Sequence, residues 1–180
     1  SFINYLCYIA SKSDRYNLSL IDLLYISNFK GGNATINEAE ETINIKLKDY
    51  SKVLTEIDDF FGDRSLRDLN HDELLFLIDK VTKIGMLVSK SSRSKIDGFS
   101  ISYLSALLCA YFPSLIPILD RRLLINLRLI DISDLDSLGQ VKNLINFYPS
   151  LIRELYKLTL STGSTIRDID REIFVRKLVI

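Results

Sequence analysis

The residues best suited to chemistry are the cations of a polar stretch at 89–95. Lys90, Arg93 and Lys95 are separated only by serines. Cationic side chains gathered on a loop form the local positive surface that binding of a phosphate group needs. The alternative is that the stretch is an ordinary solvated loop. We therefore treat these three cations as candidate phosphate-binding residues.

Other residues that often carry chemistry are few. Asp120 precedes Arg121 at the predicted start of a helix, where a carboxylate can act as the N-terminal cap and contribute about 1 kcal/mol. His71 is the only histidine, so no histidine pair can bind a metal. Cys7 and Cys109 fit neither a disulfide framework nor a four-ligand zinc site, and they favour a reducing, cytoplasmic compartment. We expect no metal and no cofactor.

Charge is distributed unevenly along a chain of zero net charge. Lys+Arg and Asp+Glu number 23 each in the 180 residues. Residues 1–90 hold 11 basic and 14 acidic side chains, whereas residues 91–180 hold 12 and 9, so the halves carry −3 and +3. Zero net charge argues against indiscriminate binding of nucleic acid but permits a local basic face in the second half. The 47% of apolar residues argues against a disordered chain.

The apolar residues recur at helical spacing and predict an all-α fold, a bundle of about eight to nine helices. Ser19 begins one helix, and capping-box spacing at Thr35 and Asn70 begins two more. The predicted helices span 2–12, 19–30, 35–61 with a bend near 49, 70–88, 101–111, 120–129, 134–147, 149–160 and 165–177. We expect residues 1–180 to form a single helical domain. The alternative is two lobes, about 1–70 with 150–180 and about 71–149.

An uncharged stretch at 101–119 is long enough to span a membrane. Pro113 and Pro117 interrupt it, and serines are scattered through it. The other predicted helices are amphipathic, as packing in water requires. No basic and then apolar signal peptide opens the chain. We therefore expect no membrane as a partner.

The stretch from Ile96 to Leu124 combines a tight turn, a helix, a proline-flanked connector, an aspartate and another helix. It resembles the helix–hairpin–helix core of the DNA glycosylase superfamily. In that core a glycine–apolar–glycine hairpin precedes a helix rich in small residues, and an aspartate follows just after a proline. Gly98 and Phe99 match the hairpin, and Asp120 matches the aspartate. The resemblance implies a glycosylase-like fold.

The chain looks closest to uncharacterised bacterial members of that superfamily. Those members carry a lysine-containing segment after the second helix and an Arg-acid-Ile-Asp-Arg helix near the C-terminus, which Lys30 and residues 167–171 match. The resemblance covers roughly residues 19–178. It implies a cleft near the aspartate, lined by Lys30, Arg121, Arg167, Asp170 and Arg171. The alternative is that the charged residues at 167–171 form surface ion pairs along the last helix and that Lys30 is a cation favoured by the dipole at a helix C-terminus.

The resemblance also implies binding of double-stranded DNA. Backbone N–H groups at Gly98, Phe99 and Ser100 would face a DNA phosphate, with the loop cations beside them. Asp120 would stabilise the positive charge that develops as an N-glycosidic bond breaks, after the base has left the stack. Ser102 stands where lyase-type members carry the attacking lysine. We therefore expect monofunctional hydrolysis rather than a Schiff-base reaction.

Two functions stay open at this point. The first is a DNA-binding protein that excises a base with Asp120. The second is a non-catalytic helical interaction module that keeps the fold and binds a protein partner. Ser100, in place of the second hairpin glycine, and the zero net charge favour the second. The dependence of binding on salt separates them, because phosphate binding weakens steeply with salt whereas an apolar protein interface weakens little.

Overall fold

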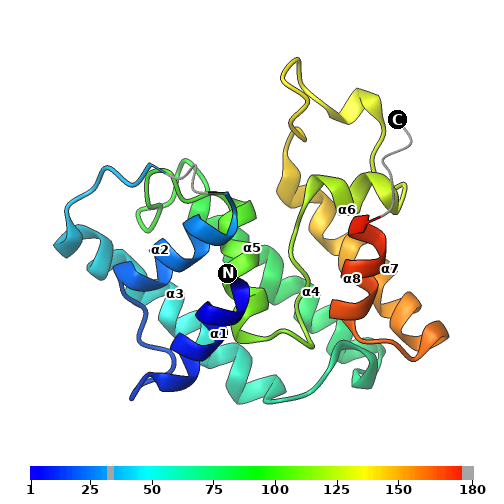
Figure 1. Ribbon diagram of the computed structural model, residues 1–180, viewed down its shortest axis with the longest axis horizontal. Helices are drawn as coiled ribbons and strands as arrows, with labels where there is room; N and C mark the ends of the chain where they lie inside the picture. Colours follow the sequence, from blue (N-terminus) through cyan, green and yellow to red (C-terminus); the bar gives the residue numbers. More distant parts are fainter. Residues whose placement is uncertain (32–34, 176–180) are drawn as a thin grey trace.

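A computed structural model of the chain describes residues 1–31 and 35–175. These residues form eight α-helices joined by loops and short 3₁₀ turns, and they contain one isolated β-bridge but no strand. The predicted all-α class is confirmed. The helices are α1 (Phe2–Ser11), α2 (Leu20–Phe29), α3 (Glu40–Phe61), α4 (His71–Gly85), α5 (Ile101–Tyr111), α6 (Arg121–Asn126), α7 (Tyr148–Thr162) and α8 (Ile166–Val175) (Figure 1).

Helix α5 lies at the centre of the molecule. Every residue from Leu104 to Tyr111 is buried, so this part of the helix is enclosed on all sides. It packs against α1 and α2, while α4 packs against α3 and α7, and α8 packs against α6 and α7. In Figure 1, α1–α3 occupy one side of the molecule and α6–α8 the other, with α4 and α5 between them. The connector after α5 brings Asp120 to the start of α6.

Three predicted helix starts are correct because short polar side chains satisfy the free N–H groups at those ends. Ser19 and Asn70 form capping boxes with the residues three positions later, at the starts of α2 and α4. At α6, the Asp120 carboxylate accepts a hydrogen bond from the backbone N–H of Arg122 at 2.8 Å. The caps that the sequence predicts therefore set where these three helices begin.

Helix α3 begins at Glu40 rather than near the predicted Thr35, and it continues without interruption to Phe61. Glu38, which we expected to complete a capping box, accepts a hydrogen bond from the backbone N–H of Asp97 at 2.6 Å and pairs with Lys46. A contact with a residue 59 positions away has thus replaced the local cap. This contact joins the segment before α3 to the loop before α5.

The predicted helix over 134–147 is wrong. A tight turn lies there, in which the backbone N–H of Gly139 donates to the carbonyl of Asp136 at 2.9 Å, and 3₁₀ turns flank it at Ile132–Asp134 and Leu144–Phe147. The Asp136 carboxylate accepts the backbone N–H groups of Leu138 and Gln140. Such bonds compete with helical hydrogen bonding and favour a turn.

Helix α6 ends at Asn126, before the predicted end at residue 129. Arg128 adopts a left-handed conformation with φ of 56°, and the N–H of Leu129 donates to the carbonyl of Leu124 at 2.9 Å. Glycine usually occupies such a helix end, so the presence of an arginine there does not indicate in the sequence that the helix stops. The predicted end of the last helix, at residue 177, lies outside the described residues.

The expected division into lobes stays a prediction. Helix α8 and all but the first two residues of α7 lie in the segment 150–180, which we assigned to the first lobe. Helix α7 packs against α4, and α8 packs against α6. The Arg167 guanidinium on α8 also lies 4.5 Å from the centre of the Phe2 ring on α1. This segment therefore touches elements of both expected lobes.

The uncharged stretch at 101–119 divides into α5 and the connector that follows Tyr111. Among residues 1–31 and 35–175, no helix has both the length and the apolar character needed to cross a membrane. The two prolines of the connector follow the end of α5. This agrees with their position in the sequence, because proline lacks a backbone N–H and interrupts a helix.

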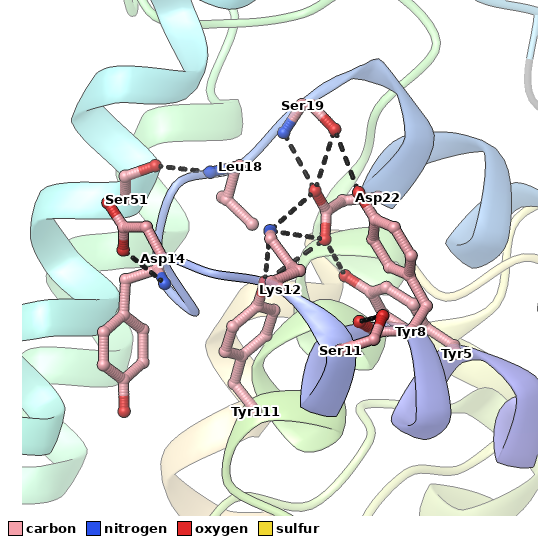
Figure 2. A network of polar contacts seen from close by, with 11 residues as sticks. Tyr5, Tyr8, Ser11, Lys12, Asp14, Leu18, Ser19, Asp22, Ser51 and Tyr111 are labelled. Carbon is pink, nitrogen blue, oxygen red and sulfur yellow. Dashed lines mark hydrogen bonds and ion pairs between the residues drawn. The ribbon is translucent and has the colours of Figure 1, made fainter.

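A buried carboxylate ties α1, α2 and α5 together (Figure 2). Asp22 is fully buried and accepts hydrogen bonds from the hydroxyls of Tyr5 at 3.0 Å and Tyr111 at 3.2 Å. Lys12 Nζ and the backbone N–H of Ser19 also donate to it, at 3.1 and 2.9 Å. Burial and the charge of Asp22 raise the pKa of both tyrosines, so their hydroxyls stay protonated as donors. The network fixes α2, whose C-terminal end enters the candidate site.

Candidate functional site

An ion pair joins the end of α2 to the start of α6. Lys30 Nζ lies 3.2 Å from Asp120 Oδ2, and the two side chains are 14% and 33% exposed. The other carboxylate oxygen, Oδ1, accepts the capping N–H of Arg122. Asp120 is therefore the helix cap that its position predicted, and it also keeps one oxygen beside a cation.

A pocket of about 540 Å³ opens beside this pair. It lies where the end of α2, the residues before α6 and one side of α8 meet. The residues that line it combine charged and apolar groups: Phe29, Lys30, Gly31, Ile118, Asp120, Arg167, Asp170, Arg171 and Val175. The structure thus brings four of the five predicted cleft residues, Lys30, Arg167, Asp170 and Arg171, around Asp120.

Asp170 is the second carboxyl group of this pocket. Its Oδ2 lies 3.3 Å from the Arg167 guanidinium, and the two side chains are 23% and 25% exposed. Burial raises the pKa of Asp170 above its ordinary value, the charge of Arg167 opposes this rise, and the charge of Asp120 adds to it. Asp170 therefore takes up a proton more readily than an exposed aspartate does.

A second pocket, of about 380 Å³, shares Lys30 and Asp120 with the first. Arg121, the remaining predicted cleft residue, lines this second pocket and not the first. Its guanidinium donates to the carbonyl of Gly139, in the turn that replaces the predicted helix. The other lining residues are Ser102, Arg122, Gln140, Val141 and Leu144. The ion pair thus lines both pockets, of which the first is mainly apolar and the second is lined mostly by charged and polar residues.

The predicted hairpin residues lie between α4 and α5, where one side of their backbone is covered. Gly98 has φ of 81°, and a Cβ there would lie 2.1 Å from the carbonyl oxygen of Thr35. Phe99 is 2% exposed and packs edge-on against Tyr50, with ring centres 5.9 Å apart. Ser100 is exposed at the N-cap position of α5. The Phe99 side chain therefore anchors the loop in the core, and its backbone N–H donates to the carbonyl of Ile96 at 3.0 Å. Because this N–H is already bonded, the expected phosphate contact is left to the backbone N–H groups of Gly98 and Ser100 and to the Ser100 hydroxyl.

The cations of the 89–95 loop differ in how they are held. Lys90 and Arg93 are exposed, as contact with a phosphate requires. Lys95 is half-buried, its ammonium lies 3.7 Å from Asp97, and its carbonyl accepts a hydrogen bond from Lys46 at 2.6 Å. Two of the three candidates are thus presented to solvent, and the third is held against its own loop. Their binding of phosphate stays a prediction.

Metal ligands and reactive thiols are the other groups that could carry chemistry. Within the part of the chain that the structure describes, no three His, Cys, Asp or Glu side chains are grouped so that they could hold a metal ion. Cys109 is buried in α5, and burial raises the pKa of its thiol to about 12. Cys7 is exposed on α1. The charged groups that line the two pockets are the remaining candidates for chemistry.

Sequence reasoning missed most of the apolar and neutral residues that line the two pockets, and it also missed Arg122. Phe29 and Ile118 stand next to predicted charged residues, but an apolar residue in a helical pattern looks the same whether it lines a pocket or the core. Gln140 fell within the segment that we expected to be helical. The closeness of Phe29 and Ile118 in sequence to predicted site residues was the one signal that could have identified them. Phe29 directly precedes Lys30, and Ile118 lies two positions before Asp120.

Comparison with known proteins assigns no family to the chain. No protein-family model, curated protein or solved structure gives a match. Function must therefore be inferred from the residues of the two pockets.

Proposed function

We propose that the chain binds double-stranded DNA and that the first pocket receives a base which has left the stack, so that Asp120 can assist hydrolysis of its N-glycosidic bond. The observation that carries this proposal is the meeting of Asp120, Lys30 and the α8 residues around one pocket of about 540 Å³. Pockets of about 300–1,000 Å³ are typical of small-ligand sites. The resemblance of the 96–124 segment to the glycosylase core supports the same function.

The lining of the first pocket suits a flat heteroaromatic ring. Phe29 and Ile118 offer apolar contact for the faces of the ring. Lys30 and Arg167 offer donors for its polar edge. Asp170, whose pKa is raised, donates a hydrogen bond when protonated and accepts one when ionised. Enzymes that act on a base in a duplex take it out of the stack into a pocket with such a lining.

Asp120 is the group that we assign to the bond cleavage. Positive charge develops on the sugar as the bond to the base breaks, and a carboxylate in contact with the sugar lowers that barrier. Oδ1 is held by the N–H of Arg122 and Oδ2 by Lys30, so both oxygens are positioned before substrate arrives. In the reaction, water adds to the anomeric carbon and the base leaves with a proton.

The exposed loop cations would supply the electrostatic attraction to the duplex. Replacing Lys90, Arg93 and Lys95 by alanine should weaken duplex binding and lower its salt dependence, by about one unit of log–log slope for each phosphate that is no longer bound. The matched control replaces Arg153 and Lys157, two exposed cations of α7, and should leave the slope unchanged. If the salt slope of duplex binding were the same in both variants, the loop cations would have no role in binding phosphate.

The first experiment measures fluorescence anisotropy of labelled duplex DNA at low and moderate salt, followed by base release from duplexes that carry damaged bases. Asp120→Asn should lose about 100-fold or more in base release. It should keep the fold, because asparagine caps a helix as well as aspartate does. Asp131→Asn is the matched control, since Asp131 also accepts a capping N–H, from Ser133, but lines neither pocket. Base release by Asp120→Asn at the wild-type rate would contradict the assignment.

Absence of duplex binding at low salt would overturn the proposed function. It would favour the other function that the sequence left open, a non-catalytic interaction module with a protein partner. One scaffold can host either function, so the fold class alone does not separate them. The Lys30–Asp120 pair would then be a structural contact between α2 and α6.

A further inference from the structure

We propose that the second pocket, of about 380 Å³, is a phosphate site for the nucleotide whose base occupies the first pocket. The phosphate is either a phosphodiester group of a DNA strand or the terminal phosphate of a free nucleotide, and both present the same anionic oxygens. This inference rests on the proposed function and deepens it. It assigns a ligand to a pocket that the cleavage reaction itself does not use.

The charges around the second pocket favour an anion. Lys30, Arg121 and Arg122 line it with a single carboxylate, Asp120, so positive groups exceed negative groups by two. The first pocket has three cations but two carboxylates, because Asp170 lines it as well. An anionic group that reaches both pockets is therefore attracted more strongly to the second.

Arg121 is held in place before any ligand arrives. Its guanidinium donates to the carbonyl of Gly139. The turn that carries this carbonyl is closed by the Asp136 carboxylate, which accepts the N–H groups of Leu138 and Gln140 at 2.9 and 2.8 Å. A planar guanidinium can bind two phosphate oxygens at once. Because Arg121 is already positioned, it loses less conformational entropy on binding than a free side chain would.

Neutral groups of the second pocket add further donors. Ser102 at the start of α5 and Gln140 in the turn carry hydroxyl and amide groups that can donate to phosphate oxygens. Lys30 and Asp120 line both pockets. A nucleotide with its base in the first pocket and its phosphate in the second therefore has its sugar beside Asp120, where the proposed cleavage takes place.

Isothermal titration calorimetry with a deoxynucleoside 5′-monophosphate and with the matching deoxynucleoside tests the site. We expect the monophosphate to bind about tenfold more tightly or better at low salt, the effect of a charge-assisted contact. Arg121→Gln should reduce this preference several-fold, and because Arg121 is exposed the variant should fold. Arg153→Gln on α7 is the matched control. Either of two outcomes would overturn the inference. In the first, the two ligands bind equally well and Arg121→Gln leaves the salt slope of duplex binding unchanged. In the second, the monophosphate binds more tightly but Arg121→Gln leaves that preference unchanged.

Binding of labelled duplex distinguishes the two sources of phosphate. If DNA supplies it, Arg121→Gln should lower the slope of log affinity against log salt by about one, and Arg153→Gln should not. A monophosphate preference without duplex binding supports the site with a free nucleotide as its ligand, and it overturns the proposed function. Duplex binding with an unchanged slope in Arg121→Gln and no monophosphate preference overturns this inference and leaves the proposed function standing.

Discussion

Gly98 offers the sharpest test of how the loop between α4 and α5 is built. A Cβ at this residue would lie 2.1 Å from the carbonyl oxygen of Thr35 and 2.9 Å from its carbonyl carbon. Both atoms belong to the backbone, so they cannot rotate aside as the end of a flexible side chain can. The variant Gly98→Ala must therefore displace either the loop or the segment that precedes α3.

Two free-energy costs add at this position. Alanine in the left-handed region, at the φ of 81° that Gly98 adopts, costs about 1 kcal/mol. Relieving an overpacked contact costs a further ~1–3 kcal/mol. We expect Gly98→Ala to lower the free energy of unfolding by about 2–4 kcal/mol. At roughly 2–4 °C per kcal/mol for a domain of this size, Tm should fall by about 4–16 °C.

Gly163→Ala is the matched control for the backbone cost alone. Gly163 has φ of 70° after the end of α7, and nothing lies within 4 Å of its Cβ position. Its replacement should lower the free energy of unfolding by only about 1 kcal/mol. Urea unfolding followed by circular dichroism measures both variants. Equal losses would refute the reasoning, because they would mean that the Thr35 backbone exerts no steric pressure on residue 98.

The remaining predictions concern the core and the acid range. Asp22→Asn should lower the free energy of unfolding by about 3–5 kcal/mol, because the buried ammonium of Lys12 loses its counter-charge; a loss below about 1 kcal/mol in urea unfolding would contradict this role. Burial raises the pKa of Glu38, but hydrogen bonds to its ionised form outweigh burial and lower that pKa below the ordinary 4.5. Its stabilisation is therefore complete above pH 4.5 and lost as the pH falls further. The stability difference between wild type and Glu38→Gln should shrink in acid, and a difference that grows there would contradict the contact. A thiol reagent should modify only Cys7 in the native protein and Cys109 only after unfolding, because Cys109 is buried with a pKa of about 12; fast modification of both in the native state would mean that α5 is not enclosed.

Elements whose ends depend on their own residues could be predicted from the sequence. Helices α2 and α4 begin where Ser19 and Asn70 cap them, because the capping partner stands three positions later in each case. The start of α3 could not be predicted, since Glu38 bonds to Asp97 rather than to its own helix. The end of α6 could not be predicted either, because Arg128 rather than a glycine adopts the left-handed conformation there.

The candidate site divides in the same way. All of its charged residues except Arg122 were named in advance, and the cleft residues among them were named because the family resemblance implied them. Lys30 and Asp120 are 90 positions apart, however, and no spacing rule connects them; only the family resemblance placed them in one cleft. The second pocket could not be foreseen as a separate site, although Arg121 was among the predicted cleft residues. It depends on the turn at Asp136, whose side chain bonds to nearby backbone groups and so overrides a helical pattern.

The network around Asp22 also constrains how the chain can fold as it is synthesised. Tyr111 follows Lys12 by 99 positions, so α1 and α2 leave the ribosome long before the last donor to the carboxylate exists. A buried carboxylate with a missing donor costs free energy, which keeps Asp22 hydrated until then. We expect the first two helices to remain exposed to water, and within reach of chaperones and proteases, until α5 has emerged and closes over them.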